Sequence, residues 1–355
     1  MLQKLRTNAL FLLRVPALFY LVIITVRNLV YDLLPGLSKA IAIPIICVGN
    51  ITVGGTGKTP MTAFLAEYFQ SLGLRVAILS RGYGRRDKKK QKIITSPTKP
   101  KDLHPDEIGD EALMLLHQLK DITLVLDADR VRGAETVYRE NNADIIILDD
   151  GFQHRRLRRD FNLVMIDSHK LFGNRQLLPA GSLREPLSAL KRADAVIFNK
   201  FDQHHPEFYR QISKLLDYVA PSKLFCARYK YKEFTSLNGK RTRTLAEMQK
   251  YSSIHAVSGL ANNDYFFTQL KASGLKLAES FAFADHHVYS RKEFNELKKF
   301  CGQQPLITTE KDADKLRLMA ATDETGFLQN IWAAKIELEL QDEERFYQLL
   351  TKFLP

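Results

Sequence analysis

The stretch from Ile43 to Leu72 constrains the fold of this chain more than any other part of the sequence. The apolar run Ile43–Val48 predicts a short buried strand, and Met61–Leu72 has the apolar spacing of a helix. Between them lies the segment Gly49–Pro60, with the sequence GNITVGGTGKTP. A strand, a glycine-rich loop ending in Gly-Lys-Thr, and a helix, in that order, are typical of a phosphate-binding loop.

This loop predicts a site for ATP and Mg²⁺. Its glycines let backbone N–H groups point at phosphate oxygens, and the helix N-terminus adds a partial positive charge. Lys58 would reach the β- and γ-phosphates, and the Thr59 hydroxyl would ligate Mg²⁺. The residues expected to bind the nucleotide are Gly54, Gly55, Thr56, Gly57, Lys58, Thr59 and Pro60. Thr52 stands where the standard pattern has glycine, and the alternative is a glycine-rich turn with an incidental lysine.

Short apolar runs alternate with helical patterns from residue 40 onward. Several runs are continuous in Val, Ile and Leu, as expected for parallel strands covered on both faces. The alternation predicts an α/β domain with a layered parallel sheet. The runs are Val76–Ser80, Ile122–Leu126, Asp144–Asp149, Leu163–Ile166 and Ala195–Phe198.

A length of 355 residues favours two domains. A smaller βα series follows the first, and two extended segments, 223–232 and 331–340, flank it and could pair as a two-stranded linker. The expected division is an N-terminal segment 1–38, a P-loop domain 39–222, and a smaller α/β domain 223–355 that includes the linker and a closing helix.

The N-terminal segment is unusual for a soluble enzyme. Val15–Val26 is almost wholly apolar and lies between basic residues, with Lys4, Arg6 and Arg14 before it and Arg27 after it. The run is shorter than the roughly 20 apolar residues of a spanning helix. It predicts a membrane anchor, either spanning or interfacial, with a helix packed on the protein as the alternative. The basic side would face the cytoplasm.

The charge balance points to an anionic partner. The formal net charge is +12 at pH 7, which suits a nucleic acid, an anionic membrane or a phosphorylated substrate. The sequence contains no recognition helix and no aromatic RNA motif, so we expect no nucleic-acid partner. The basic run Arg85–Lys92 indicates a solvated loop or an anion-binding patch. Cys47, Cys226 and Cys301 form no metal or disulfide pattern, which favours a reducing compartment.

A second acidic motif follows the run Asp144–Asp149. In P-loop proteins, a carboxylate at the end of a hydrophobic strand beside the loop holds the Mg²⁺ shell. Asp149 and Asp150 are the candidates here. The alternative is a strand-end turn, because Asp-Gly is a turn dipeptide.

Three further polar groups are candidates for the chemistry. Asp110 opens a helical pattern, where it is either an N-cap or the general base that phosphoryl transfer to a hydroxyl requires. Arg184 lies in a loop rich in proline and glycine, and could pair with phosphate bidentately. Asp285 and His286 form either a satisfied polar pair or a catalytic imidazole held by a carboxylate.

Together these motifs resemble one family, the tetraacyldisaccharide 4′-kinases, or lipid A 4′-kinases, of Gram-negative bacteria. They span nearly the whole chain in the family's order, after a hydrophobic N-terminal segment. The motifs are Val48–Pro60, Ser80–Arg85, Gly109–Glu111, Leu148–His154, Leu178–Glu185, Asn199–Lys200, Phe283–His286 and Thr309–Asp312. Departures at Ala112, at Ser182 and over residues 258–263 remove no chemical group.

The resemblance implies a lipid kinase that transfers the γ-phosphate of ATP to the 4′-hydroxyl of a tetraacylated glucosamine disaccharide 1-phosphate, in lipid A biosynthesis. It implies a P-loop kinase-like domain and a smaller α/β domain, with the active site in the cleft between them. Lys58 and Thr59 match the family's contacts to triphosphate and Mg²⁺. Asp149 and Asp150 match its second acidic motif, so the expected metal ligands are Thr59, Asp149 and Asp150.

The resemblance also implies roles for the remaining candidates. Asp110 matches the proposed catalytic base with His286 as its partner, and Arg184 matches an arginine of the substrate and phosphate region. With Lys58, these are the expected catalytic residues. The expected partners are the acylated disaccharide phosphate and the inner membrane. The chain would act there as a monomer, at the cytoplasmic face.

A membrane-attached P-loop ATPase switch, without a phosphorylated substrate, is the alternative function. Such a protein would use ATP to change partners. Its dimeric subclass has a second lysine just before the glycine pair, where this chain has Val53. The two functions differ in whether ATP turnover depends on an added glycolipid.

Overall fold

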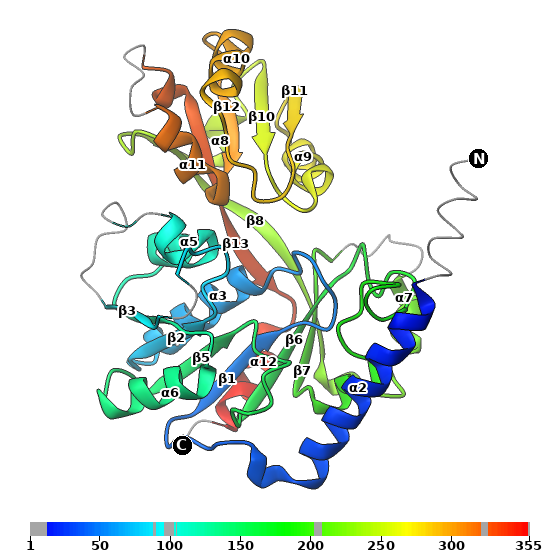
Figure 1. The fold of residues 1–355 in the computed structure, drawn as a ribbon. Coiled ribbons are helices and arrows are strands. Elements are labelled where there is room, and N and C mark those ends of the chain that lie inside the picture. Colours follow the sequence, from blue (N-terminus) through cyan, green and yellow to red (C-terminus); the bar gives the residue numbers. More distant parts are fainter. Residues whose placement is uncertain are drawn as a thin grey trace. The chain divides into compact units, whose positions relative to one another are not determined.

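The computed structural model describes residues 13–87, 90–95, 103, 105–201, 208–320 and 326–353. Contacts divide the chain into two compact units. The first comprises Met1–Arg228 and Glu339–Pro355, and the second comprises Tyr229–Leu338. The chain passes from the first unit to the second in strand β8 and returns in strand β13, which is the neighbour of β8 in the sheet. Figure 1 labels these elements.

The sheet of the first unit has the strand order β8-β7-β6-β1-β5-β2-β4-β3. All neighbouring strands in this order are parallel except the edge pair β3 and β4. The strands are β1 (Ile45–Gly49), β2 (Val76–Ser80), β3 (Lys92–Thr95), β4 (Ile122–Leu126), β5 (Ile145–Asp149), β6 (Phe161–Asp167), β7 (Ala195–Asn199) and β8 (Leu224–Ser236). Every residue of β1, β2, β4, β5 and β7 is buried, which confirms the continuous apolar runs as central parallel strands.

The order of these strands sets the position of the site. Strand β1 lies between β5 and β6, and its register pairs Val48 with Asp149. The loop that follows β1 and the acidic pair that ends β5 therefore leave the sheet at the same edge. Open α/β sheets bind their ligands at the carboxyl ends of their parallel strands.

Helices cover this sheet, and their chain positions alternate with the strands. Helix α3 packs on β1, β2 and β5, and α6 packs on β2 and β4. The helices of the first unit are α2 (Arg14–Leu33), α3 (Lys58–Ser71), α4 (Pro105–Ile108), α5 (Asp110–Gln118), α6 (Arg130–Arg139), α7 (Phe208–Ser213) and α12 (Glu343–Thr351). The short 3-10 helices are η1 (Pro35–Leu37), η3 (Leu187–Arg192) and η4 (Pro221–Lys223).

The closing helix α12 belongs to the first unit, which differs from the predicted boundary of a domain over 223–355. Aromatic contacts explain the difference. The Tyr347 ring stacks on Tyr68 of α3 with centroids 4.0 Å apart, and Phe346 packs edge-on against Phe225 of β8. After the end of α12, Phe353 packs against Phe161 of β6.

The second unit repeats the parallel arrangement on a smaller scale. Its strand order is β11-β10-β12-β13-β8, with β9 antiparallel to β8. The strands are β9 (Thr242–Arg243), β10 (Ile254–Ser258), β11 (Leu277–Ala282), β12 (Leu306–Thr309) and β13 (Ile331–Leu340). The helices are α8 (Leu245–Met248), α9 (Asn263–Ala272), α10 (Arg291–Cys301), α11 (Glu310–Ala320) and the 3-10 helix η5 (Phe327–Asn330).

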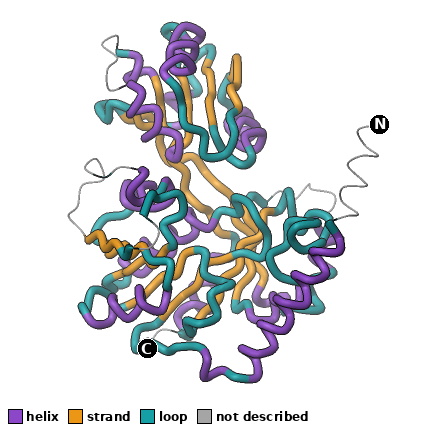
Figure 2. The backbone as a smooth tube through the Cα atoms, viewed as in Figure 1, coloured by secondary structure: helices purple, strands orange, loops and turns teal. Residues whose placement is uncertain are grey.

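Two apolar clusters lie on the two faces of this smaller sheet. Leu306 packs in the cluster that includes residues of α10 and α11, whereas the next residue, Ile307, packs in the cluster that includes residues of α8 and α9. Ile331 and Trp332 alternate in the same way. Figure 2 shows helices on both sides of these strands. The predicted α/β class with a second, smaller α/β unit is confirmed.

Helix α2 lies along one side of the first unit (Figure 1). Within the described residues, it is the one helix whose length and mean hydropathy, 20 residues and 1.4, would allow it to cross a membrane, on length and composition alone. A stripe with helical period faces the unit, with Ala17 and Ile24 buried and Tyr20 and Leu21 packed on the core. The exposed large hydrophobic residues of this helix are Val15, Leu18, Phe19, Val22, Ile23, Val26, Leu29, Val30 and Leu33. Lys4 and Arg6 lie outside the described residues.

Candidate phosphoryl-transfer site

The glycine-rich loop joins β1 to α3 as the sequence predicts. Gly57 is the N-cap of α3 with φ of 89°, and Gly54 has φ of 108°. Both conformations lie in the left-handed region that glycine adopts without strain. Gly57 has no side chain that could cap the helix, so the N–H groups of the first turn are available to phosphate oxygens. Lys58 and Thr59 are the first two residues of that turn.

Side chains from neighbouring strand ends fix the loop. Asn50 donates to the Thr56 hydroxyl at 3.1 Å, and Asn199 donates to the Thr56 carbonyl at 3.0 Å. Lys200 Nζ donates to the Gly55 carbonyl at 3.2 Å and to Asp167 Oδ2 at 2.6 Å. These contacts assign a supporting role to the Asn199–Lys200 motif, for which the sequence predicted none. Residues 52–56 of the loop line a cavity of about 290 Å³. The other residues that line this cavity are Asp167, Lys170, Leu171, Gly173 and Ser182.

The acidic pair follows β5 beside the loop. Asp149 is 5% exposed and accepts hydrogen bonds from Ser80 at 3.2 Å and Thr62 at 3.4 Å. Burial, with the neighbouring charge of Asp150, raises the pKa of Asp149 to about 6. For Asp150, burial alone would raise the pKa, but Lys58 and Arg184 outweigh it and lower the pKa.

Two of the predicted catalytic cations converge on Asp150. Lys58 Nζ lies 3.6 Å from Asp150 Oδ1, and Arg184 Nη1 donates to both carboxylate oxygens at 3.0 and 3.2 Å. The loop and the acidic pair thus form one cluster. Asp150 has φ of 48°, and such strain in a non-glycine residue is common at functional sites.

The donor set fits Mg²⁺. Two carboxylates and the Thr59 hydroxyl lie at the same edge of the sheet, and Mg²⁺ in kinases is held by one or two carboxylates together with substrate phosphates. Among the residues that the structure describes, no group of three or more His, Cys, Asp or Glu side chains could hold a metal alone.

Arg184 is positioned by the loop itself and by α2. Its segment forms a bridge from Leu183 to Thr52, and Arg184 N donates to the Ile51 carbonyl at 2.7 Å. The Tyr20 hydroxyl of α2 donates to the Arg184 carbonyl at 2.9 Å. A helix expected to meet the membrane therefore contacts the backbone of a predicted catalytic residue.

Glu185 connects these parts from a fully buried position. Its carboxylate accepts from Gln153 at 3.0 Å, from Arg192 at 2.9 Å and from Asn28 of α2 at 2.7 Å. Gln153 also donates to the Asn50 carbonyl in the loop at 2.9 Å. Sequence analysis assigned Glu185 no role. A glutamate next to a predicted catalytic arginine, with Arg192 seven residues later, was the available signal.

Asp110 opens helix α5, which packs beside α3. The N-cap is Gly109, so Asp110 does not take the cap position that was its alternative role. Gly109 has φ of 92°, and a Cβ there would lie 2.3 Å from the Tyr83 carbonyl oxygen. This close approach joins the start of α5 to the loop after β2.

His286 lies in the second unit, in the loop between β11 and α10. His286 Nε2 and Asp285 Oδ1 are 3.9 Å apart, within ion-pair range but beyond hydrogen-bond distance. Lys311 Nζ contacts both groups. The structure thus brings Lys58, Thr59, Asp149, Asp150 and Arg184 together, with Asp110 in the same unit and His286 in the other.

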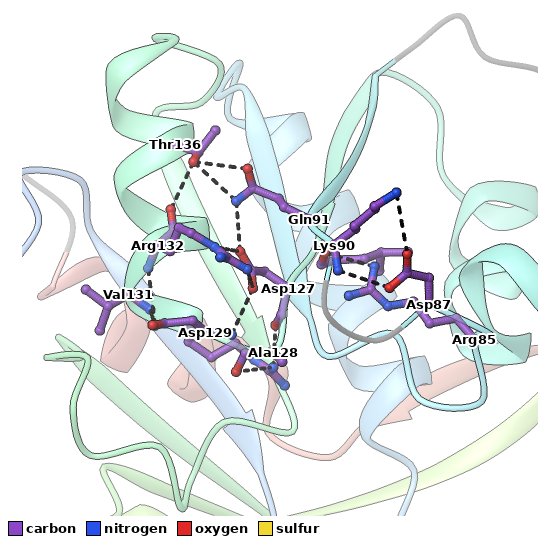
Figure 3. Close-up of polar contacts among 12 residues, drawn as sticks. Arg85, Asp87, Lys90, Gln91, Asp127, Ala128, Asp129, Val131, Arg132 and Thr136 are labelled. Atoms are coloured by element: carbon purple, nitrogen blue, oxygen red, sulfur yellow. Dashed lines mark hydrogen bonds and ion pairs between the residues drawn. The ribbon is translucent and has the colours of Figure 1, made fainter.

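A polar network at the end of β4 holds part of the basic run (Figure 3). Asp127 is fully buried and accepts from Arg132 Nη2 at 2.7 Å and from Gln91 at 3.0 Å. Arg85 is 2% exposed and donates to the Leu126 carbonyl at 3.1 Å. Arg85 is therefore not in the solvated loop that the composition favoured, while residues 88–89 of that run lie outside the described residues.

Arg130 is a further basic group that sequence analysis missed. It is 2% exposed at the first position of α6, and burial lowers its pKa to about 10, with Asp149 and Asp150 acting against this. Burial, Arg130 and Arg81 together lower the pKa of His154 to about 4. A cation at a helix N-terminus opposes the helix dipole, which was the signal in the sequence.

The chain is similar to known proteins over nearly its whole length. A family model described as "Tetraacyldisaccharide-1-P 4'-kinase" matches residues 9–355. The tetraacyldisaccharide 4'-kinase of Geobacter metallireducens is 35% identical over the whole of both chains. That of Halothermothrix orenii is 33% identical over 97% of this chain and 92% of that protein. A crystal structure of LpxK from Aquifex aeolicus in complex with ATP matches with a TM-score of 0.73 and 29% identity, covering both chains completely.

Proposed function

The chain belongs to the tetraacyldisaccharide-1-P 4'-kinase family, and on that premise we propose that its P-loop, together with Asp110, Arg184 and His286, carries out the reaction. The protein is an ATP-dependent phosphotransferase of lipid A biosynthesis that uses ATP and Mg²⁺. It phosphorylates the 4′-hydroxyl of a tetraacylated disaccharide 1-phosphate, and the alternative of a switch ATPase is not favoured. The observation that carries the residue assignment is the convergence of Lys58 and Arg184 on Asp150 beside the loop.

The cations of the first unit are suited to neutralise charge on the transferring phosphoryl group. The N–H groups of the first turn of α3 would bind phosphate oxygens, and Lys58 would exchange its contact with Asp150 for the β- and γ-phosphates. Thr59, Asp149 and Asp150 would hold Mg²⁺, which when bound offsets negative charge on those phosphates. Arg184 contacts Asp150 through one guanidinium nitrogen, Nη1, and would stabilise charge that develops during transfer.

The acceptor hydroxyl needs a base. In this proposal the Asp110 carboxylate accepts the proton of the 4′-hydroxyl while the oxygen forms its bond to the γ-phosphorus. The bond from the γ-phosphorus to the bridging oxygen breaks, and ADP leaves with that electron pair. We propose His286 as the partner of Asp110, as the family resemblance implies. The position of Asp110 at the start of α5, beside α3, supports this role.

We further propose that α2 lies in the membrane interface and does not span the bilayer. Its inward stripe contacts the first unit from Ala17 to Tyr31, which is about 21 Å of helix at 1.5 Å per residue. A helix attached to the protein over that length cannot also cross a hydrocarbon core about 30 Å thick. Its exposed apolar stripe would enter the acyl region, where the acylated substrate resides.

The cytoplasmic face of the inner membrane is the proposed location. The donor is ATP, and the surplus of basic residues favours a leaflet rich in anionic lipids. Cys47 and Cys301 are free and buried, which fits a reducing compartment.

The assignment of Asp110 is tested by transfer of labelled γ-phosphate from ATP to a detergent-dispersed tetraacyl disaccharide 1-phosphate. Asp110→Asn is expected to lower kcat by at least about 100-fold with little change in the KM for ATP, because a general base contributes about 10²–10⁴-fold. Asp106→Asn, at an exposed position of helix α4, is the control and should behave as wild type. A loss confined to ATP affinity would reject Asp110 as the base and place it with the metal ligands.

A further inference from the structure

The motif Thr309–Asp312 begins helix α11 with a reciprocal hydrogen-bond pair. The Thr309 hydroxyl donates to Asp312 Oδ2 at 2.7 Å, and Asp312 N donates back to Thr309 Oγ1 at 3.1 Å. Gly259 N, at the end of β10, donates to the same carboxylate oxygen at 2.9 Å. Asp312 is fully buried, so the first turn of α11 is fixed against the carboxyl ends of β10 and β12. Two residues of the motif are therefore explained by the start of the helix.

The loop that carries His286 is also held in one conformation. Phe283 N donates to the Ser258 carbonyl at 2.9 Å, and Asn263 donates to the Phe283 carbonyl at 2.7 Å. His287 stacks on Phe283 with centroids 4.5 Å apart. His286 itself has φ of 60°, a conformation that costs free energy in a non-glycine residue and persists only where its surroundings impose it.

Lys311 is the residue of the motif that points into this loop. Its Nζ donates to Asp285 Oδ1 at 2.8 Å and lies 3.3 Å from His286 Nε2. Burial alone would raise the pKa of Asp285, but the hydrogen bond and charge of Lys311 outweigh it and lower the pKa, so the carboxylate is ionised. Asp285 also accepts from His286 N at 3.1 Å. The Asp285 carboxylate thus accepts hydrogen bonds from both the Lys311 ammonium and the His286 backbone.

The chemistry of these groups sets the state of the imidazole. An ammonium group has three donors and no acceptor, so the ring nitrogen beside it must accept. A ring whose Nε2 accepts from an ammonium group is neutral and carries its proton on Nδ1. Free imidazole side chains interconvert between tautomers, and the contact made by one ring nitrogen decides which tautomer is present.

We propose that Lys311 is a positioning residue that holds His286 neutral with its proton on Nδ1. This inference rests on the proposed role of His286 as the partner of Asp110. A ring in this state can donate one hydrogen bond from Nδ1 to a carboxylate, and it does not bring a positive charge that would lower the basicity of that carboxylate. Lys311 would therefore act on turnover through His286, without contact to either substrate.

The test measures tautomer and turnover in the full-length protein. Two-bond ¹H–¹⁵N spectra of protein labelled with ¹⁵N-histidine report the tautomer, and His286→Asn identifies the signals. Lys311→Met keeps the stem and removes the ammonium, and Lys311→Arg keeps a cation. Lys335→Met, which removes another part-buried lysine of the same unit, 3.5 Å from Glu233, is the matched control.

Wild type and Lys335→Met should show the Nδ1–H form at neutral pH. Lys311→Met should lose it and lower kcat about tenfold or more, with the KM of each substrate within about twofold. Lys311→Arg should restore the tautomer and part of kcat. Thermal melts of the variants detect misfolding, which would lower the midpoint relative to wild type.

Two outcomes would overturn parts of the scheme separately. An Nδ1–H signal that persists in Lys311→Met would reject Lys311 as the positioning residue whatever the turnover. Wild-type turnover by His286→Asn would instead reject the catalytic role of His286, while the tautomer comparison would still decide what Lys311 does to the ring.

Discussion

Asp149 illustrates at the residue scale how a site side chain can oppose stability. It is buried at the end of β5, and its pKa of about 6 is above the value near 3.9 of an unfolded chain. The folded protein therefore binds this proton more tightly than the unfolded chain does. The contribution of this carboxyl group to the free energy of unfolding is fully present below pH about 4, and it is lost as the pH rises through about 6.

Asp149→Asn should accordingly raise the thermal midpoint at pH 7.5 and abolish transfer. The expected gain in unfolding free energy is on the order of 2 kcal/mol, because an ionised, desolvated carboxylate is removed. At pH 4.5 the gain should fall to about a third of that value. Calorimetric melts at both pH values, without nucleotide, measure the difference.

Asp144→Asn is the matched control, at the other end of the same strand. Hydrogen bonds from Arg75 lower the pKa of Asp144, so its ionised form favours the folded state and its replacement should not stabilise the protein at pH 7.5. If Asp149→Asn melted below wild type at pH 7.5, or shifted equally at both pH values, burial would not be the cause of its raised pKa.

At the scale of elements, α2 has two faces that differ in exposure and in contacts. Ile23 is 63% exposed and Ile24 is 6% exposed, so these adjacent isoleucines lie on the outward and the inward face. The outward face is apolar, whereas the inward face contacts Arg184 and Glu185 through Tyr20 and Asn28.

Ile23→Asp should weaken membrane binding without unfolding the protein. Removing one apolar side chain from the acyl region is worth roughly 2–3 kcal/mol, or about 30- to 160-fold in the partition coefficient. Flotation with vesicles of phosphatidylethanolamine and phosphatidylglycerol measures binding, and a thermal melt should be unchanged. Ile24→Asp, on the inward face, should lower the melt instead. Equal effects of both variants on both readouts would contradict the two-faced assignment.

Local patterns in the sequence predicted the elements that bind phosphate. The apolar run before Gly49 and the dipeptide of Asp149 and Asp150 each carry their signal within a few residues, because strands and glycine-rich turns are determined locally. The contact of Glu185 with Asn28 of α2 and the docking of α12 were not predictable in this way. They join side chains more than a hundred residues apart, as Asn28 and Glu185 do, and such pairs leave no period in the sequence.

At the scale of the whole molecule, each unit has its own apolar clusters, and the two share strands β8 and β13. The nucleotide loop belongs to the first unit, whereas the single tryptophan of the chain, Trp332, is buried in the second. Arg241 and Arg243 lie over its ring at 5.2 Å. Its fluorescence therefore reports the second unit alone.

ATP-Mg²⁺ should shift the unfolding of the two units by different amounts. A ligand at 100 times its Kd stabilises the state that binds it by about 2.7 kcal/mol. The far-UV circular dichroism transition should move to higher urea, while the Trp332 fluorescence transition should move less. Lys58→Ala, which loses the loop lysine, should remove the shift. Identical shifts of both signals would show that the two units unfold as one cooperative system.

The proposed placement of the outward face of α2 in the membrane interface would have a consequence for how the enzyme meets its substrate. A protein held at a lipid surface searches in two dimensions, and the amount of substrate it encounters is set by surface density. Diluting a fixed number of substrate molecules with inert phospholipid would then slow turnover, although their concentration in the suspension stays the same. Rates would accordingly scale with mole fraction in the bilayer, and the membrane composition of the cell would itself regulate flux through this step.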